Sequence, residues 1–245
     1  MTFNTFFTER VYNIDADERE QVNTLTTKYL NIFNSSVADR YRILTATPQV
    51  YFASKLETDD TLYIDTIKYT SLQNGKKYNL DVYVSFERKS GIEGSHSEDN
   101  KKAFIYYYTV GFNKRLIADT IIHELLHAKQ HYKEHTSDYN KFVERPEIGS
   151  LKDYYFDPVE YPVQEATTIN AIEQAYNEAS NEQKEEILLF LKVFAQSGGN
   201  LPDEIKIPFY LENKVKFLDT LIQNKYNPKY KTFLKKLYWL YDKLK

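Results

Sequence analysis

The stretch from Thr120 to Ala128 constrains this chain more than any other. It reads Thr-Ile-Ile-His-Glu-Leu-Leu-His-Ala, so two histidines stand four positions apart and a glutamate follows the first. Residues four apart lie on one face of a helix, which lets His123 and His127 present ring nitrogens to one metal ion. The aliphatic residues on both sides supply an apolar flank that can bury the helix. We therefore expect a metal-binding helix over about residues 114–134.

This His-Glu-x-x-His pattern resembles the signature of the zincin metallopeptidases. The resemblance covers the helix and one downstream segment. It implies a Zn²⁺ ion held by His123 and His127, with Glu124 as the general base that takes a proton from an attacking water. The metzincin subgroup needs glycine and histidine further along, where this chain has Gln130 and Lys133. That subgroup is excluded, so the third ligand is expected to be a carboxylate from a later helix, as in gluzincin-type peptidases.

A downstream segment supplies that carboxylate. The residues Tyr-Pro-Val-Gln-Glu-Ala, ending at Ala166, resemble the glutamate-bearing helix of small gluzincin-like peptidases. Proline suits the first turn of a helix, so this helix is expected to begin near Pro162. Glu165 is the predicted third ligand, and Glu160 is its strongest competitor. Two further glutamates precede them at Glu144 and Glu147.

The remaining histidines are expected to stay outside the metal's first ligands. Successive positions four apart advance about 6 Å along a helix, so His131 lies beyond the reach of a zinc seated between the first two. His131 and Tyr161 are candidates for contacting the substrate or the transition state. His135 is expected at the surface. His96 falls in a polar stretch over residues 88–102, and we expect it to be an exposed loop histidine.

Composition narrows the classes of partner and compartment. The chain has no cysteine, so a zinc site must use histidine and carboxylate ligands and disulfides are excluded. A net charge of −3 gives no sign of a nucleic-acid partner. No apolar stretch has transmembrane length, and the N-terminus lacks the pattern of a secretory signal. We therefore expect no membrane partner and a cytoplasmic or virion-associated protein.

Periodicity and turn signals outline the other elements. A helix is expected from about Asp15 to Asn34, followed by a strand-rich block that includes residues 41–52. The Asn74-Gly75 turn joins expected strands at 61–69 and 78–86, which form a hairpin. Another strand is expected at 103–110. Helices are expected over residues 181–196, 209–223 and 228–244.

These elements predict an α+β fold. The resemblance implies a zincin-like arrangement, with a mostly antiparallel sheet packed on the metal helix and a C-terminal helical region after it. We expect one domain over residues 1–245, with the metal-site core at about 15–180 and a helical extension at about 181–245. No linker or internal repeat forces a boundary within it.

Two classes of function follow. The first is a zinc-dependent peptidase acting on a peptide or protein substrate. The second is a structural or assembly protein of a virion, which keeps a zincin fold without catalysis and binds protein partners. The 22 tyrosines suit a docking role, and the many Asn, Lys and Ile residues suggest an AT-rich genome such as that of a phage. A peptidoglycan hydrolase is a third hypothesis.

Overall fold

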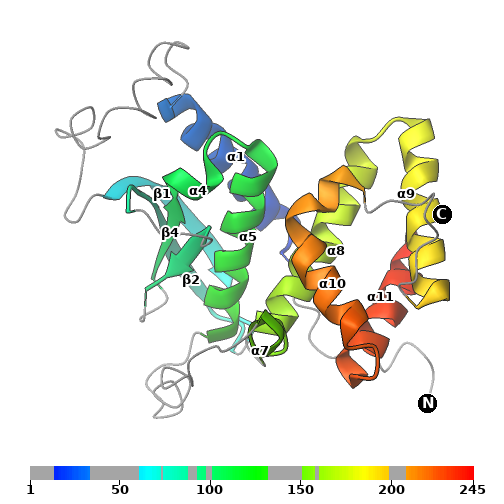
Figure 1. The fold of residues 1–245 in the computed structure, drawn as a ribbon. Coiled ribbons are helices and arrows are strands. Elements are labelled where there is room, and N and C mark those ends of the chain that lie inside the picture. The colour runs from blue at the N-terminus through cyan, green and yellow to red at the C-terminus, as the bar shows by residue number, and fades with distance from the viewer. Residues whose placement is uncertain are drawn as a thin grey trace. The chain divides into compact units, whose positions relative to one another are not determined.

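The chain forms an α+β structure with one small mixed sheet and mostly helices (Figure 1). The computed structural model divides it into two compact units, Met1–Asn140 and Lys141–Lys245, each with its own core. No linker-like stretch marks this boundary in the sequence. The structure describes residues 14–33, 61–72, 74–87, 93–97, 101–131, 151–157, 160–198 and 208–245. The strand expected within residues 41–52 lies outside these ranges, as do His135, Glu144 and Glu147.

The N-terminal unit is a four-stranded sheet with helices packed on it. The sheet has the order β1-β2-β4-β3, in which β1 and β2 pair antiparallel, β2 and β4 pair parallel, and β4 and β3 pair antiparallel. The strand β3 therefore lies at one edge. The elements of this unit are α1 (Ala16–Phe33), β1 (Thr61–Thr70), β2 (Lys77–Ser85), β3 (Gly94–His96), β4 (Lys102–Tyr106), α4 (Tyr107–Val110) and α5 (Lys114–His131).

The predicted hairpin is confirmed, and it contains a bulge. Strand β1 pairs with β2 in antiparallel register, with a shift between Tyr63 and Asp65. Successive side chains of a strand point to opposite faces, so one extra residue reverses the alternation. Leu62 is buried before the shift, and Ile67 and Tyr69 are buried after it. The bulge thereby keeps apolar side chains on one face at both ends of β1.

Helices α1 and α5 pack on the sheet and on each other (Figure 1). An apolar stripe of α1 is buried at Val22, Leu25 and Tyr29, which recur at helical spacing. Strand β2 contributes three more buried residues at alternate positions: Leu80, Val82 and Val84. Burying apolar surface contributes about 25 cal/mol per Å² to the free energy of folding. The contacts of α5 with these apolar side chains therefore hold the helix in place.

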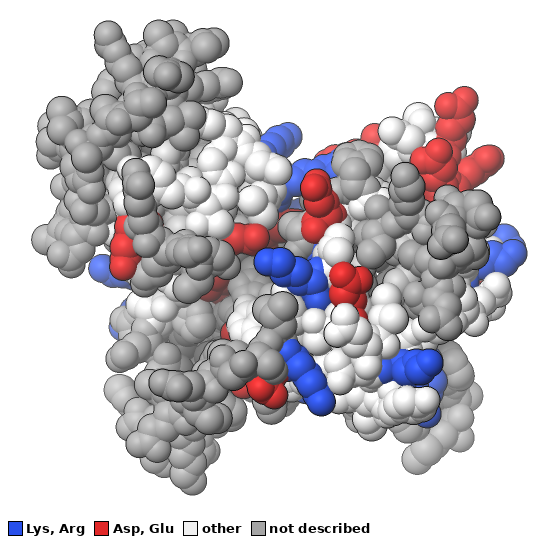
Figure 2. Space-filling model, in the orientation of Figure 1, with Lys and Arg blue, Asp and Glu red and all other residues white. Residues whose placement is uncertain are grey.

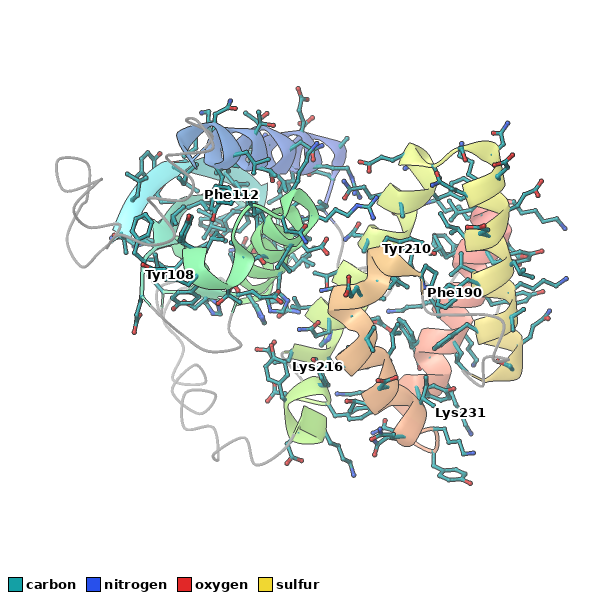
Figure 3. The ribbon with its side chains drawn as sticks, turned by 45° about the horizontal axis from the view of Figure 1, so that its top comes forward. Tyr108, Phe112, Phe190, Tyr210, Lys216 and Lys231 are labelled. Carbon is teal, nitrogen blue, oxygen red and sulfur yellow. The ribbon has the colours of Figure 1, made fainter. Side chains whose placement is uncertain are left out.

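The strand expected at residues 103–110 is shorter than predicted. It ends at Tyr106, and one helical turn, α4, follows. Tyr107 and Val110 are both buried, which is the spacing of a helix. Gly111 ends the turn at φ +52°, a conformation that favours glycine. The rings of Tyr108 and Phe112, labelled in Figure 3, lie 5.5 and 6.0 Å from the Tyr107 ring, which fixes the turn by aromatic packing.

The C-terminal unit is a set of helices around a second core. The helices expected at residues 181–196 and 228–244 are confirmed, whereas the one expected at 209–223 is a 3₁₀ segment followed by an α-helix. Phe190 and Tyr210, labelled in Figure 3, belong to this core together with Phe194, Phe217 and Phe233. The elements are α7 (Leu151–Tyr155), α8 (Glu160–Glu178), α9 (Asn181–Ser197), η2 (Phe209–Lys214), α10 (Val215–Gln223) and α11 (Pro228–Leu244).

Local signals set the ends of the helices in this unit. Ser180 accepts a hydrogen bond from the Gln183 N–H, and the Gln183 side chain accepts one from the Ser180 N–H, so α9 begins with a capping box. Gly198 ends α9 in the left-handed conformation at φ +64°. Asn227 caps α11, and Pro228 occupies its first turn.

Among the described residues, no helix combines the length and apolarity needed to cross a membrane.

Candidate metal centre

Helix α5 carries the His-Glu-x-x-His residues, and its local sequence explains its start and its orientation. The Asn113 side chain accepts a hydrogen bond from the Leu116 N–H at 3.1 Å, which satisfies one of the free donors at the helix start. Ile117, Ile121 and Leu125 recur at helical spacing and are fully buried. Anchoring this apolar stripe fixes the direction in which the remaining side chains of α5 point.

His123 and His127 converge, as their spacing predicted. Their Nε2 atoms lie 3.0 Å apart, and their ring centroids lie 4.6 Å apart. Two nitrogens bound to a tetrahedral zinc at their usual bond length are about 3.3 Å apart. The pair therefore fits a divalent cation with a shift of a few tenths of an ångström. His127 is buried and His123 is partly exposed.

Glu124 is buried beside the two histidines. Burial acts to raise the pKa of its carboxyl, but a hydrogen bond with His96 and the nearby imidazoles of His123 and His127 act to lower it. The lowering wins, so the pKa of Glu124 lies below its ordinary value. The carboxylate is therefore ionised at neutral pH and can accept a proton.

His96 belongs to this cluster, and the prediction of an exposed loop histidine was wrong. It lies at the end of β3, and its side chain is 20% exposed. Its Nδ1 lies 3.2 Å from Oε2 of Glu124, and its ring stacks on that of His127 at 5.1 Å. The sequence of this strand, Gly-Ser-His, has low strand propensity, and the strand forms through backbone pairing with β4. Propensity therefore could not predict it.

Glu165 and Tyr161 lie on α8, where they contact each other and α11. The Glu165 carboxylate accepts hydrogen bonds from Lys236 Nζ at 2.5 Å and from the Tyr161 hydroxyl at 3.2 Å. That hydroxyl also donates to the Lys229 carbonyl at 2.8 Å. Burial and the Glu165 charge raise the pKa of Tyr161 well above its ordinary value. Both groups therefore have partners within the C-terminal unit.

Glu160 is the first residue of α8. Its backbone N–H donates to Asp157 Oδ1 at 3.3 Å, which caps the helix, and its side chain is buried. Five positions separate it from Glu165, and five helical steps turn by about 140° beyond a full revolution. The two carboxylates therefore point in different directions from α8. His131 is the last residue of α5.

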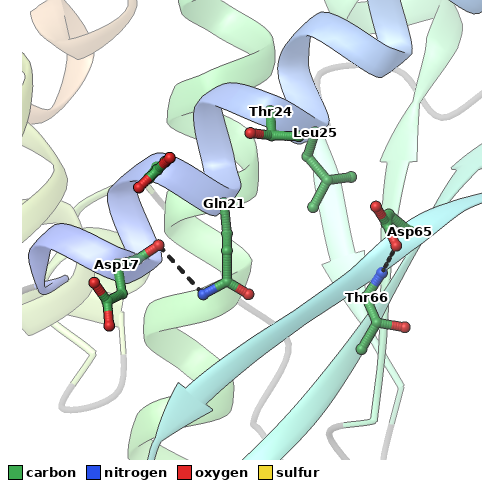
Figure 4. A pocket seen from close by; sticks show the side chains of 7 residues that line it. Asp17, Gln21, Thr24, Leu25, Asp65 and Thr66 are labelled. Carbon is green, nitrogen blue, oxygen red and sulfur yellow. Dashed lines mark hydrogen bonds between the residues drawn. The ribbon is translucent and has the colours of Figure 1, made fainter.

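A groove elsewhere in the N-terminal unit has a different character. It lies between α1 and β1 and is lined by polar and acidic side chains, among them Asp17, Gln21 and Asp65 (Figure 4). Lys28 pairs with Asp65 there and lowers its pKa. The groove has no histidine in its lining.

On the face drawn in Figure 2, acidic and basic side chains are interspersed, so neither sign of charge dominates.

Comparisons of this chain with protein-family models, with curated proteins and with solved structures returned no match.

Proposed function

We propose that this protein is a zinc-dependent peptidase with a zincin-like fold. The observation that carries the proposal is the convergence of the His123 and His127 Nε2 atoms at 3.0 Å, beside a buried glutamate whose pKa is lowered. Two imidazoles and an adjacent ionised carboxylate are the donor set and the proton acceptor that metal-assisted hydrolysis needs. The substrate class is a peptide or protein.

The third ligand is a carboxylate of α8, and we propose Glu160. Glu165, the residue predicted from the sequence, neutralises Lys236 and accepts from Tyr161. Using it as a ligand would leave Lys236 without this partner. Glu160 is buried and points from a different side of α8 than Glu165 does. The same engagement of the Tyr161 hydroxyl argues against a role for Tyr161 in the transition state.

Each residue has a definite task in this proposal. His123, His127 and Glu160 would hold the cation, which supplies Lewis acidity that lowers the pKa of a water molecule. Glu124 accepts a proton at its carboxylate from the attacking water. It then donates that proton to the nitrogen of the leaving amine. Its burial keeps bulk water away from the carboxylate, so the proton stays with the reacting groups.

The ligand set is tested by metal content. Purified protein supplied with Zn²⁺ is expected to hold about one zinc per chain by mass spectrometry. His123→Ala and Glu160→Ala are expected to lose it, whereas Glu165→Ala is expected to keep it. Retention in Glu160→Ala with loss in Glu165→Ala would restore the ligand predicted from the sequence. A parent protein that binds no zinc would overturn the proposal.

Catalysis is tested separately on the zinc-loaded protein. A library of peptides from a digested proteome, read by mass spectrometry, serves as substrate. Cleavage is expected with the parent protein, and Glu124→Gln is expected to reduce it by at least about 100-fold at unchanged zinc content. Equal cleavage by the two proteins would rule out Glu124 as the proton acceptor.

A structural role in a virion or another assembly is the second candidate. Among the described residues of the C-terminal unit, large exposed apolar or aromatic side chains are found at Leu189, Tyr226, Tyr238 and Trp239. Aromatic residues of this kind are enriched where proteins contact each other. This candidate predicts a protein that binds zinc and leaves the peptide library intact. It also predicts that the protein is recovered as part of a larger assembly.

A further inference from the structure

We propose that β3 is a positioning strand for Glu124, in which His96 and Gly94 together fix the orientation of the carboxylate. The inference rests on the proposed role of Glu124 as proton acceptor. It adds a residue, His96, that the His-Glu-x-x-His pattern does not contain. The juxtaposition involves only residues of the N-terminal unit.

His96 holds one oxygen of the carboxylate. Its Nδ1 lies 3.2 Å from Glu124 Oε2. We infer that the carboxylate oxygen accepts this hydrogen bond from the ring, which places a proton on Nδ1. The same ring stacks on His127 at 5.1 Å. One side chain therefore contacts both the proposed proton acceptor and a proposed metal ligand.

Gly94 makes room for the other oxygen. It precedes His96 by two positions, so the two residues face the same side of β3. A Cβ atom at Gly94 would lie 2.8 Å from Glu124 Oε1 and 2.7 Å from Thr120 Cγ2. Both distances are shorter than side chains tolerate. The glycine backbone therefore lies directly against the carboxylate, and no other residue fits there without displacing it.

Strand β3 is itself held firmly, as a positioning element must be. It pairs with β4, and this pairing is extended by hydrogen bonds from Tyr106 N–H to the Glu93 carbonyl and from Ser97 N–H to the Lys102 carbonyl, at 2.9 and 2.8 Å. Ser95 lies between Gly94 and His96 and faces the opposite side, which makes it a matched control.

The first test separates positioning from folding. On the zinc-loaded protein, His96→Ala is expected to lower kcat by about 10–100-fold with zinc content and KM unchanged, the size of effect usual for residues that orient a metal site. His96→Asn, whose amide can donate from nearly the same place, is expected to recover part of the loss. Ser95→Ala is expected to stay within about twofold of the parent. Parent-like kcat in His96→Ala would overturn the proposal.

The second test needs no catalysis. Long-range ¹H–¹⁵N spectra of the histidine rings in the zinc-free full chain are expected to show His96 protonated at Nδ1. Replacing the partner, in Glu124→Met, is expected to remove that preference. An His96 ring protonated only at Nε2, or one indifferent to Glu124→Met, would refute the contact. A parent that binds no zinc or cleaves nothing would instead refute the peptidase, because these spectra report the contact either way.

Discussion

Glu18 is a buried carboxylate of α1 whose partners lie just before that helix, in β1 and in α5. It accepts hydrogen bonds from Lys129 Nζ at 2.5 Å, from the Thr70 N–H at 3.3 Å and from the Asp15 N–H at 2.9 Å. The side chains of the ion pair are only 2% and 4% exposed. The cost of removing both charges from water offsets much of their attraction. The pair therefore sets the position of α1 against α5 more than it adds stability.

This balance predicts the outcome of a double-mutant cycle. Lys129→Met alone is expected to cost about 3–5 kcal/mol, because it leaves a buried carboxylate without its cation. The double variant Glu18→Leu with Lys129→Met is expected to regain most of that loss. Urea unfolding followed by circular dichroism measures both. Glu20→Gln, on the exposed side of α1, is the control and is expected to change stability by less than about 0.5 kcal/mol. Additive single effects would contradict a coupled pair.

Gly94 gives a second prediction at this scale. Gly94→Ala places a methyl group against Thr120 and Glu124, so the unit is expected to lose about 1–3 kcal/mol of stability through overpacking. Displacing the carboxylate by about 1 Å is expected to lower hydrolysis by about 100-fold. Thermal unfolding and the peptide-library assay check the two parts. Full activity in a stable Gly94→Ala protein would show that the contact is not needed.

The residues of α5 could be predicted from the sequence, and their partner could not. The spacing of His123 and His127 alone places both rings on one face of a helix. His96 is 27 positions before His123, and only the pairing of β3 with β4 brings it to Glu124. The choice between Glu160 and Glu165 likewise depends on Lys236, which is 71 residues beyond Glu165.

Among the elements, α9 shows how local signals define a helix. Ser180 and Gln183 form its capping box, and Gly198 ends it. Ser180→Ala is expected to cost about 1 kcal/mol, because it removes the acceptor for the Gln183 N–H. Asn181→Ala, at the exposed next position, is the control and should have little effect. Urea unfolding of the two variants measures the free energy of unfolding that each substitution costs. Equal stabilities would mean that the cap does not contribute.

Elements with strong local signals, the β1–β2 hairpin among them, matched their predictions, whereas β3 and α4 did not. Helix α11 agrees with its predicted bounds, since Asn227 and Pro228 mark its start and an apolar stripe runs along it. Strand β3 and the turn α4 were missed. The first exists only through its bonds to β4, and the second because Gly111 and aromatic packing override the strand propensity of four aromatic and β-branched residues.

The whole molecule consists of two units, each with its own hydrophobic core. Among the residues that the structure describes, the buried core of the C-terminal unit comes from α8, α9, η2, α10 and α11, and Tyr155 and Phe156 pack against it. A unit with its own core is expected to fold independently. A fragment of residues 141–245 should therefore give a helical circular dichroism spectrum and one cooperative urea transition. A fragment without a cooperative transition would show that this core needs the rest of the chain.

The parallel pairing of β2 with β4 has a consequence for the order of events in folding. Strands β1 and β2 are joined by a short turn and can pair quickly, but β4 can join β2 only after the two strands, which are further apart along the chain, have been brought together. Strand β3 lies between these two strands in the sequence. We therefore expect the arrangement around Glu124 to be completed late. A folding intermediate in which β4 has not yet paired with β2 would already contain both histidines of α5. It would lack β3, the strand that orients Glu124.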